Sequence, residues 1–253
     1  MLNIGGKRIR PILMLLSHQL FSDDIEKSLK AALGIELFHN FTLLHDDIMD
    51  KAPLRRGLKT VHEKWDNNTA ILSGDTMLVQ AFHFISQVEN KNLRKVLEIF
   101  NKASTEVCEG QQWDMDFEKR EDVTLSEYLK MIEYKTSVLL ATSLQIGGIN
   151  GGASAEQQDH LYKFGKNIGI AFQLKDDLLD AFGNPEKFGK QVGGDIILNK
   201  KTFLYLKALQ LANESQRKQL IQLFSVLNNE NKVDEVKSIF SNLNIQKHTI
   251  HIQ

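Results

Sequence analysis

Cysteine is almost absent from this chain, since Cys108 is the only one among 253 residues. A single cysteine supports neither a disulfide framework nor a thiolate zinc site, so a cytoplasmic, reducing setting is the simplest expectation. An excess of either charge is also lacking, because 31 basic residues stand against 32 acidic ones. No global field therefore points to nucleic acid or to an anionic membrane, and any basic site must be local.

Proline and long apolar runs are scarce as well. Proline occurs only three times, no run is long and apolar enough to form a transmembrane segment, and residues 1–10 carry charge where a signal peptide has an apolar core. Helical spacing recurs instead, as in the stripe of Leu33, Leu37, Phe41, Leu44 and Ile48. Turn signals predict breaks at 22–24, 52–60, 90–91, 147–154 and 182–194. None is long enough for a linker, so we predict an all-α chain with a single domain over residues 1–253.

An acidic cluster stands near the end of that stripe, where residues 44–50 read Leu-His-Asp-Asp-Ile-Met-Asp. Asp46 and Asp50 are i and i+4, so their carboxylates share one helix face and repel each other unless a cation lies between them. Hard oxygen ligands suit Mg²⁺. One such cluster is explained equally well as a solvated acidic patch, because acidic residues are normally exposed.

A second cluster favours the metal interpretation. Residues 172–180 read Phe-Gln-Leu-Lys-Asp-Asp-Leu-Leu-Asp and repeat the DDxxD spacing 130 positions later. Both copies are flanked by leucine and phenylalanine, which solubility does not explain. Two carboxylate faces loaded with Mg²⁺ and placed opposite one another would hold a strongly anionic ligand such as a diphosphate, and would help it to leave.

Basic residues suited to such a ligand occur in short groups. Residues 5–11 place three cations in a frame of glycine and proline just before a predicted helix, where backbone amides also favour anions. Arg55 and Arg56 follow the first cluster by five residues. Each of these features taken alone is common on protein surfaces.

In combination and in this order, the motifs resemble those of the trans-prenyl diphosphate synthases, the polyprenyl synthetases of the farnesyl and geranylgeranyl diphosphate synthase type. The motifs are GGKRIRP, LLHDDIMD, RRG, GQQWD, KT, FQLKDDLLD, GKQVGGD and NKKT, from Gly5 to about Thr202. The resemblance implies an all-α isoprenoid-synthase bundle of about ten helices around a central cavity, usually a homodimer. Relative to that family the sequence is expected to be short at both termini.

The resemblance also assigns roles by motif. Mg²⁺, three ions per active site, would be held by Asp46, Asp50 and Asp176, with Asp177 and Asp180 in support. Gln111 and Asp114 would help to order the metals or the departing diphosphate. The allylic diphosphate would also be bound by Arg55, Lys135, Lys190 and Lys200, and metal-free isopentenyl diphosphate by Lys7, Arg10, His39 and Arg56. Thr136 and Gln173 would direct oxygen dipoles at the allylic cation.

The implied reaction condenses isopentenyl diphosphate with dimethylallyl, geranyl or farnesyl diphosphate by ionisation, condensation and elimination. A C15–C20 trans-prenyl diphosphate results, with geranylgeranyl slightly favoured. The tail should extend along the helix below Asp46, where each turn rises about 5.4 Å, so Phe38, Phe41 and Thr42 are the predicted chain-length residues. In this family an aromatic at the Phe41 position without a second at the Thr42 position resembles geranylgeranyl enzymes.

Two other functions share parts of this pattern. A class I terpene cyclase has the helical fold and the first DDxxD, but usually replaces the second with an Asn/Asp-Ser/Thr-Glu metal motif. A non-catalytic subunit of a heteromeric prenyl synthase tends to lose one aspartate motif. Both motifs are intact here and Lys7, Arg10 and Arg56 are present, so the synthase is favoured.

Overall fold

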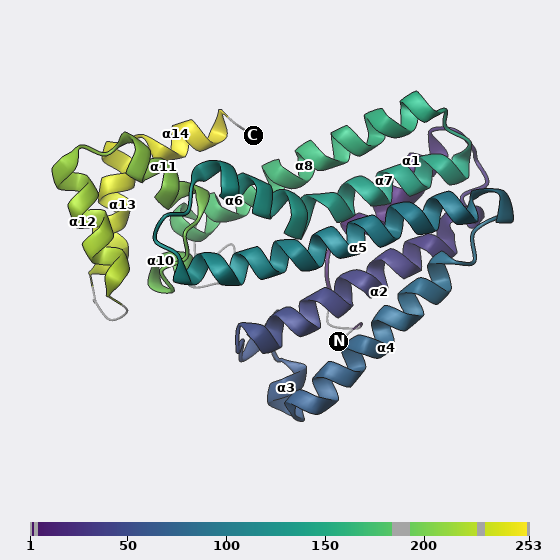
Figure 1. Ribbon diagram of the computed structural model, residues 1–253, viewed down its shortest axis with the longest axis horizontal. Coiled ribbons are helices and arrows are strands. Elements are labelled where there is room, and N and C mark those ends of the chain that lie inside the picture. The colour runs from purple at the N-terminus through teal and green to yellow at the C-terminus, as the bar shows by residue number, and fades with distance from the viewer. Residues whose placement is uncertain (1, 3–4, 184–192, 227–230, 252–253) are drawn as a thin grey trace. The chain divides into compact units, whose positions relative to one another are not determined.

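Helices make up nearly all the regular structure of this chain (Figure 1). The computed structural model describes residue 2 and residues 5–183, 193–226 and 231–251. Within them the one sheet is a hairpin of two short strands, β1 (Leu54–Arg55) and β2 (Leu58–Lys59). The prediction of an all-α chain is confirmed, and the hairpin lies inside the predicted break at 52–60.

The chain divides into two compact units. Unit 1 comprises residues 1–105 and 138–166, and unit 2 comprises residues 106–137 and 167–253. Two helices, α5 (Asn90–Lys119) and α8 (Ala155–Phe182), contribute residues to both units. The single domain expected from the sequence therefore stays a prediction.

Unit 1 is built from long helices that pack side by side. They are α1 (Ile9–Gln19), α2 (Glu26–Met49), the short α3 (Val61–Lys64), α4 (Asn67–Ile85), α7 (Val138–Gly151) and the first parts of α5 and α8. Helix α2 packs along α4, and α1 along α7. Glycine permits the second contact, because a Cβ at Gly147 would lie 2.1 Å from the Met14 carbonyl oxygen.

The buried face of α2 differs in part from the predicted stripe. Phe41 and Leu44 are buried as expected, but Leu33 is 51% exposed. Ile35 and Phe38 are fully buried instead. Ser28 and Ala31 are fully buried as well, so the buried face runs from the start of α2 to the first aspartate cluster and Leu33 lies off it.

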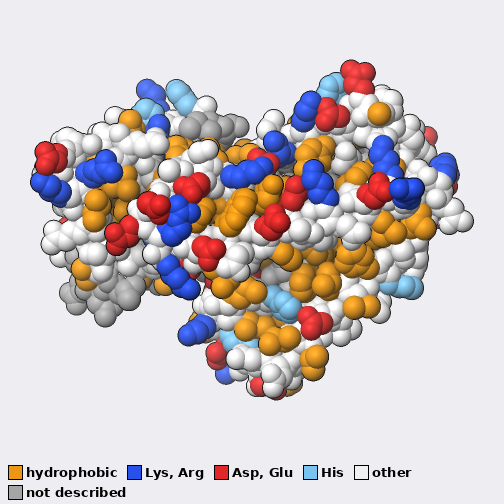
Figure 2. Space-filling model, viewed as in Figure 1, with side chains coloured by type: hydrophobic (Ala, Val, Ile, Leu, Met, Phe, Trp, Pro, Cys, Tyr) orange, Lys and Arg blue, Asp and Glu red, His pale blue; other side chains and the backbone are white. Residues whose placement is uncertain are grey.

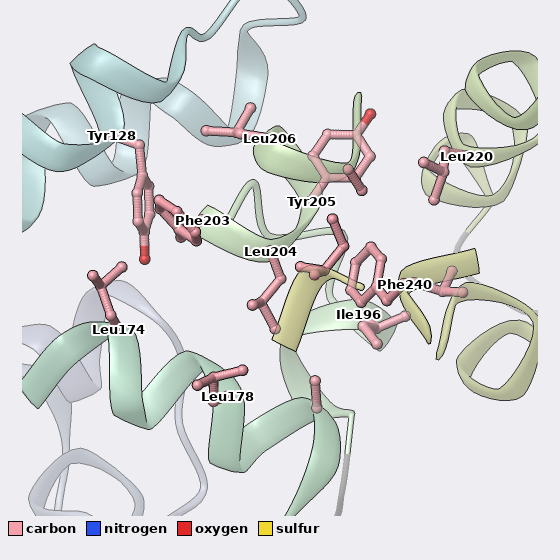
Figure 3. Close-up of a cluster of buried hydrophobic side chains, with 14 of the residues drawn as sticks. Tyr128, Leu174, Leu178, Ile196, Phe203, Leu204, Tyr205, Leu206, Leu220 and Phe240 are labelled. Carbon is pink, nitrogen blue, oxygen red and sulfur yellow. The ribbon is translucent and has the colours of Figure 1, made fainter. Parts of the chain in front are cut away.

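Unit 2 contains α6 (Leu125–Ile132), the π-helix η1 (Glu133–Ser137), α10 (Gly194–Ile197), α11 (Phe203–Leu211), α12 (Glu214–Ser225), α13 (Lys232–Asn242), α14 (Ile245–Ile250) and the remainder of α5 and α8. Capping boxes start two of these helices, Thr124 with Glu127 at α6 and Asn213 with Gln216 at α12. Their apolar faces enclose one cluster, in which Phe203 and Leu204 of α11 lie near Leu174 and Leu178 of α8 (Figure 3).

The π-helix η1 separates α6 from α7 and carries Lys135 and Thr136. Wider π-turns are rare and frequently occur at functional sites. The backbone of η1 lies close to α5, since a Cβ at Gly110 would be 2.3 Å from the Lys135 nitrogen. Gly110 of the GQQWD motif therefore allows a close approach that any side chain would prevent.

Helices α5 and α8 have 30 and 28 residues, which exceeds the length needed to cross a bilayer. Both carry many polar and charged residues. Among the described helices, none combines sufficient length with the apolar character of a membrane span.

Candidate active site

A basic cluster surrounds His39 on α2. The Nη1 atom of Arg10 lies 3.2 Å from Nε2 of His39. Burial, together with the positive charges of Arg10, Arg56, Arg55 and Arg8, lowers the pKa of His39 to about 2. Burial also lowers the pKa of Arg10 to about 10, against the attraction of Glu36. A neutral imidazole among fixed cations leaves a net positive field, which suits a bound anion.

The loop before α1 closes on the same cluster. The guanidinium of Arg56 donates to the carbonyl oxygen of Gly5, and a Cβ at Gly6 would lie 2.7 Å from Arg56 Nη1. Gly6 also has φ +131°, which side chains rarely adopt. The Arg8 guanidinium pairs with Glu36 on α2. The structure therefore brings the predicted residues Arg10, His39 and Arg56 together with the loop that carries Lys7.

The first aspartate motif lies at the C-terminal end of α2. Its last residue, Asp50, directly follows the helix and is the C-cap. Asp46 is half-buried and Asp50 exposed. Arg55 donates from Nε to Asp47 Oδ1 at 2.7 Å, and its Nη2 lies 3.5 Å from Asp46 Oδ2. Asp47 is buried, and this burial raises its pKa against the charge of Arg55. Asp47 thus anchors Arg55 beside Asp46.

The predicted chain-length residues lie on α2 within unit 1. The Phe38 ring is fully buried, with its centroid 5.5 Å from Phe41 and 5.3 Å from Phe100 of α5. The ring centroid of Phe41 lies 4.7 Å from that of His45. Thr42 is half-buried and its hydroxyl donates to the His39 carbonyl at 2.8 Å. Phe38 and Phe41 are therefore part of the aromatic core, and their role in chain length stays a prediction.

The second aspartate motif lies on α8 in unit 2, and its members differ in environment. Asp176 is exposed. Asp177 is only 3% exposed and accepts hydrogen bonds from Tyr128 Oη at 2.6 Å, the Phe203 amide at 3.3 Å and Gln173 Nε2 at 3.2 Å. Burial raises the pKa of Asp177 to about 7, although Tyr128 opposes the shift. Asp180 Oδ2 accepts a hydrogen bond from the backbone amide of Asp195 at 3.0 Å.

Several predicted residues line one cleft in unit 2, with a volume of about 110 Å³. Lys135 Nζ lies 2.6 Å from Asp114 Oδ2, and Thr136 donates to Gln173 Oε1 at 3.3 Å. The cleft is lined by Asp114, Phe117, Glu118, Tyr128, Met131, Lys135, Gln173, Asp177, Asp195, Lys200, Lys201 and Thr202. Gln111 lies one turn before Asp114 on α5, and Lys190 lies outside the described residues.

The carboxylates fit Mg²⁺ by their chemistry. In the described part of the chain, no three acidic, histidine or cysteine side chains form a ready metal cluster. Mg²⁺ characteristically keeps several waters and takes one or two carboxylates together with substrate phosphates. The pair Asp46 and Asp50, one turn apart at the end of α2, and the exposed Asp176 provide such ligands. Metal binding by these three, and by Asp114, Asp177 and Asp180, stays a prediction.

Four residues that contact or line the candidate site were not predicted from the sequence. Asp47 and Asp195 stand inside quoted motifs, and the helical spacing of Phe41, Leu44 and Asp47 could have placed Asp47 on the buried face. Lys201 Nζ donates to the carbonyl oxygens of Phe117 and Glu118 at 2.8 and 3.2 Å, which fixes the segment after α10. Tyr128 carries no local signal, because its partner Asp177 is 49 positions away.

Comparison with known proteins agrees with this geometry. The family model described as Polyprenyl synthetase matches residues 1–243. The geranylgeranyl diphosphate synthase of Methanosarcina mazei is 46% identical over 212 residues, which cover 83% of this chain and 65% of that protein. A crystal structure of a geranylgeranyl pyrophosphate synthase matches with a TM-score of 0.93 at 46% identity, over 99% of this chain and 78% of that one.

A third protein carries ligands. The geranylgeranyl pyrophosphate synthase from Corynebacterium glutamicum, solved in complex with isoprenyl diphosphate and magnesium, has a TM-score of 0.88 at 28% identity, over 100% of this chain and 78% of that one. The chain belongs to the polyprenyl synthetase family, and its predicted all-helical isoprenoid-synthase fold is confirmed. It spans about two thirds of the length of the Methanosarcina relative.

Proposed function

We propose that this chain is a Mg²⁺-dependent trans-prenyltransferase that condenses isopentenyl diphosphate with an allylic diphosphate. The single observation that carries the proposal is the arrangement of charges on α2. His39 lies in a cluster of arginines, and two helical turns further on the same helix ends in the Asp46 and Asp50 carboxylates. Two turns rise about 10.8 Å. One helix thus presents a direct anion site and a separate cation site, as a reaction between two diphosphates requires.

In the proposed mechanism the two substrates are held by different chemistry. Lys7, Arg10 and Arg56 bind the isopentenyl diphosphate directly, with His39 as a neutral neighbour. Asp46, Asp50 and Asp176 would hold Mg²⁺, supported by Asp114, Asp177 and Asp180. When bound, Mg²⁺ neutralises charge on the allylic diphosphate and so favours its departure. The same diphosphate is also bound by the cations Arg55, Lys135, Lys190 and Lys200.

The chain's own polar groups then act on the carbon skeleton. The oxygens of Thr136 and Gln173 stabilise the allylic cation, the double bond of isopentenyl diphosphate attacks it, and a proton is lost to the released diphosphate. Apolar side chains such as Phe117 and Met131 of the cleft would help to exclude water, which would otherwise trap the cation. The proposed product is a C15–C20 diphosphate, with geranylgeranyl favoured over farnesyl, as the name of the Methanosarcina relative supports.

A homodimer and a cytoplasmic location belong to the same proposal. Exposed apolar side chains on α4 support self-association, since Leu72 and Val79 are 66% and 65% exposed and lie two turns apart on one face. Figure 2 shows hydrophobic side chains gathered over the part of unit 1 that includes α4. Burial of such a patch is a common basis for subunit contacts.

Incubation with labelled isopentenyl diphosphate and each of the three allylic primers tests the function. With Mg²⁺ we expect a C15–C20 prenyl diphosphate, and with EDTA none. Release of a hydrocarbon from the allylic diphosphate alone would identify a terpene cyclase instead. Absence of product with every primer would support a non-catalytic subunit, which a second chain from the same heteromer would activate.

A further inference from the structure

The second aspartate motif contains one carboxylate that is used entirely inside the protein. Asp177 Oδ2 accepts from the Tyr128 hydroxyl of α6 and from the Phe203 amide at the start of α11. Asp177 Oδ1 accepts from Gln173 Nε2, one turn earlier on α8. Figure 3 shows the Tyr128 hydroxyl pointing toward α8 beside Leu174, with the Phe203 ring next to it. Three donors from three elements therefore hold this carboxylate in place.

This arrangement decides which end of the Gln173 amide faces which neighbour. Tyr128 and Phe203 already donate to Asp177 Oδ2, and Gln173 Nε2 donates to Oδ1, so the NH₂ end of Gln173 faces Asp177. The carbonyl oxygen then points the other way, where Thr136 donates to it at 3.3 Å. The reversed amide would place its carbonyl oxygen against Asp177 Oδ1, and the hydrogen bond from Gln173 Nε2 would be lost.

The orientation matters because Gln173, Asp177 and Tyr128 line the same cleft as Asp114, Lys135 and Lys200. A carbonyl oxygen directed at a developing cation stabilises it, whereas an NH₂ group in the same place repels it. The benefit depends on a dipole that is already oriented before the charge forms.

We propose that Tyr128 and Asp177 are positioning residues that hold the Gln173 amide with its carbonyl oxygen toward the allylic carbocation. This inference rests on the proposed function and adds a specific role for two buried side chains. It gives Asp177 the role of orienting an amide in place of the supporting metal role proposed above, while Asp176 on the exposed side of the same helix would hold the metal. Tyr128 acts through Asp177, which it holds by the shortest hydrogen bond of the three.

The two roles for Asp177 predict different kinetics. Loss of a metal ligand raises the Mg²⁺ concentration needed for half-maximal rate. Loss of an orienting contact lowers kcat and leaves the Mg²⁺ requirement and both KM values unchanged.

The first experiment compares Tyr128→Phe with Tyr205→Phe. Both changes remove one hydroxyl from a buried tyrosine of unit 2, but Tyr205 stacks on Phe224 and has no hydrogen bond to a carboxylate among the described residues. Tyr128→Phe is expected to lower kcat about 10-fold to 100-fold, with KM and the Mg²⁺ midpoint within twofold. Tyr205→Phe is expected to match the wild type. An equal loss in both variants, or a loss that appears in the Mg²⁺ midpoint, overturns the proposal.

The second experiment needs no turnover. Calorimetry compares an allylic diphosphate analogue that carries an ammonium at the cation position with its uncharged isostere. Wild-type protein should prefer the charged analogue, and Tyr128→Phe and Asp177→Asn should each reduce that preference about tenfold. On a Gln173→Leu background, Tyr128→Phe should change the preference no further, because the amide is gone.

The outcomes separate the two proposals. If the wild type showed no preference for the charged analogue and made no prenyl product, the proposed function itself would fail. If the wild type showed the preference and both variants retained it, only the positioning role would fail. Circular dichroism and thermal melting identify a variant that has lost its fold. Should Tyr128→Phe be one, Asp177→Asn, which keeps the side-chain shape, decides the question.

Discussion

Arg10 Nη1 and His39 Nε2 lie 3.2 Å apart, and this contact fixes the state of the histidine. A guanidinium has donors and no acceptor, so Nε2 of His39 must be the unprotonated nitrogen and Nδ1 carries the proton. The imidazole is therefore neutral in the folded protein. It can donate through Nδ1 while the surrounding arginines supply the positive charge.

The stability of the fold should consequently decrease in mild acid. The pKa of His39 is lowered to about 2 in the folded protein, so below about pH 6.5 protons bind preferentially to the unfolded chain. Stability from this group is complete above pH 6.5 and is lost as the pH falls. Between pH 7 and pH 5 the free energy of unfolding should fall by about 2 kcal/mol through His39. Urea unfolding at each pH measures it.

His39→Gln should be less sensitive to pH over the same range, because glutamine can accept from Arg10 but does not titrate. His160→Gln is the matched control, since it replaces an exposed histidine of unit 1. A parallel pH dependence in the wild type and His39→Gln would contradict the prediction.

Asp46→Asn and Asp176→Asn should each abolish most of the activity. Removal of one charged oxygen ligand weakens Mg²⁺ binding, and metal assistance supplies several kcal/mol to such reactions, so kcat should fall roughly 100-fold to 10,000-fold. Steady-state rates at rising Mg²⁺ concentrations measure this effect. Asp159→Asn, an exposed aspartate paired with Lys163, should retain the wild-type rate. Near-normal turnover in Asp46→Asn with an intact fold would contradict the assignment.

The two diphosphates should respond to different substitutions. Lys7→Ala and Arg56→Ala should weaken isopentenyl diphosphate about tenfold, close to 1.4 kcal/mol each, and leave the allylic substrate unaffected. Lys200→Ala and Lys190→Ala should weaken binding of the allylic diphosphate and leave the affinity for isopentenyl diphosphate unaffected. Calorimetric titration without metal isolates the first site, and Lys30→Ala, an exposed lysine of unit 1, serves as the control. Unchanged affinity of Lys7→Ala for isopentenyl diphosphate would refute the division.

Product length should follow the side chains before the first aspartate motif. Phe41→Ala and Phe38→Ala should lengthen the product, and Thr42→Phe should shorten it, as chromatography of the products shows. Phe38→Ala also removes a fully buried ring packed against Phe100, so it should destabilise the fold by about 3–5 kcal/mol. If Thr42→Phe and Phe41→Ala both gave the wild-type product, these residues would be core packing alone.

Much of the fold follows from local patterns. Helical spacing, scarce proline and turn residues predicted an all-α chain and the breaks at 22–24 and 52–60, whereas the break predicted at 90–91 lies inside the start of α5. The break at 147–154 was placed too early, because α7 continues to Gly151. Glycines 147 and 148 are helical residues that permit close packing, and their composition alone resembles a turn. Leu33 was predicted to be buried because helical spacing alone does not show which apolar residues face the core.

The candidate site was predictable where chemistry is concentrated in short motifs. The spacing of Asp46 and Asp50 and the basic residues around Arg10 identify charge that demands a partner. The contacts of Asp177 with Tyr128 and of Lys201 with Phe117 join distant positions of the chain. Such pairs depend on tertiary packing, and a single sequence contains no periodicity that would indicate them.

The π-helix η1 sets the rotational register between α6 and the residues that follow it. A π-turn holds one residue more than an α-turn in the same span, so Glu133–Ser137 contains one residue more than a regular helix would. Deleting Glu133 would restore uninterrupted α-helical winding and rotate Tyr128 by about 100° relative to Thr136. Lys135 would no longer be presented to Asp114 while Tyr128 met Asp177. The shorter chain would have a regular helix here, but the contacts of Lys135 with Asp114 and of Tyr128 with Asp177 could not form together.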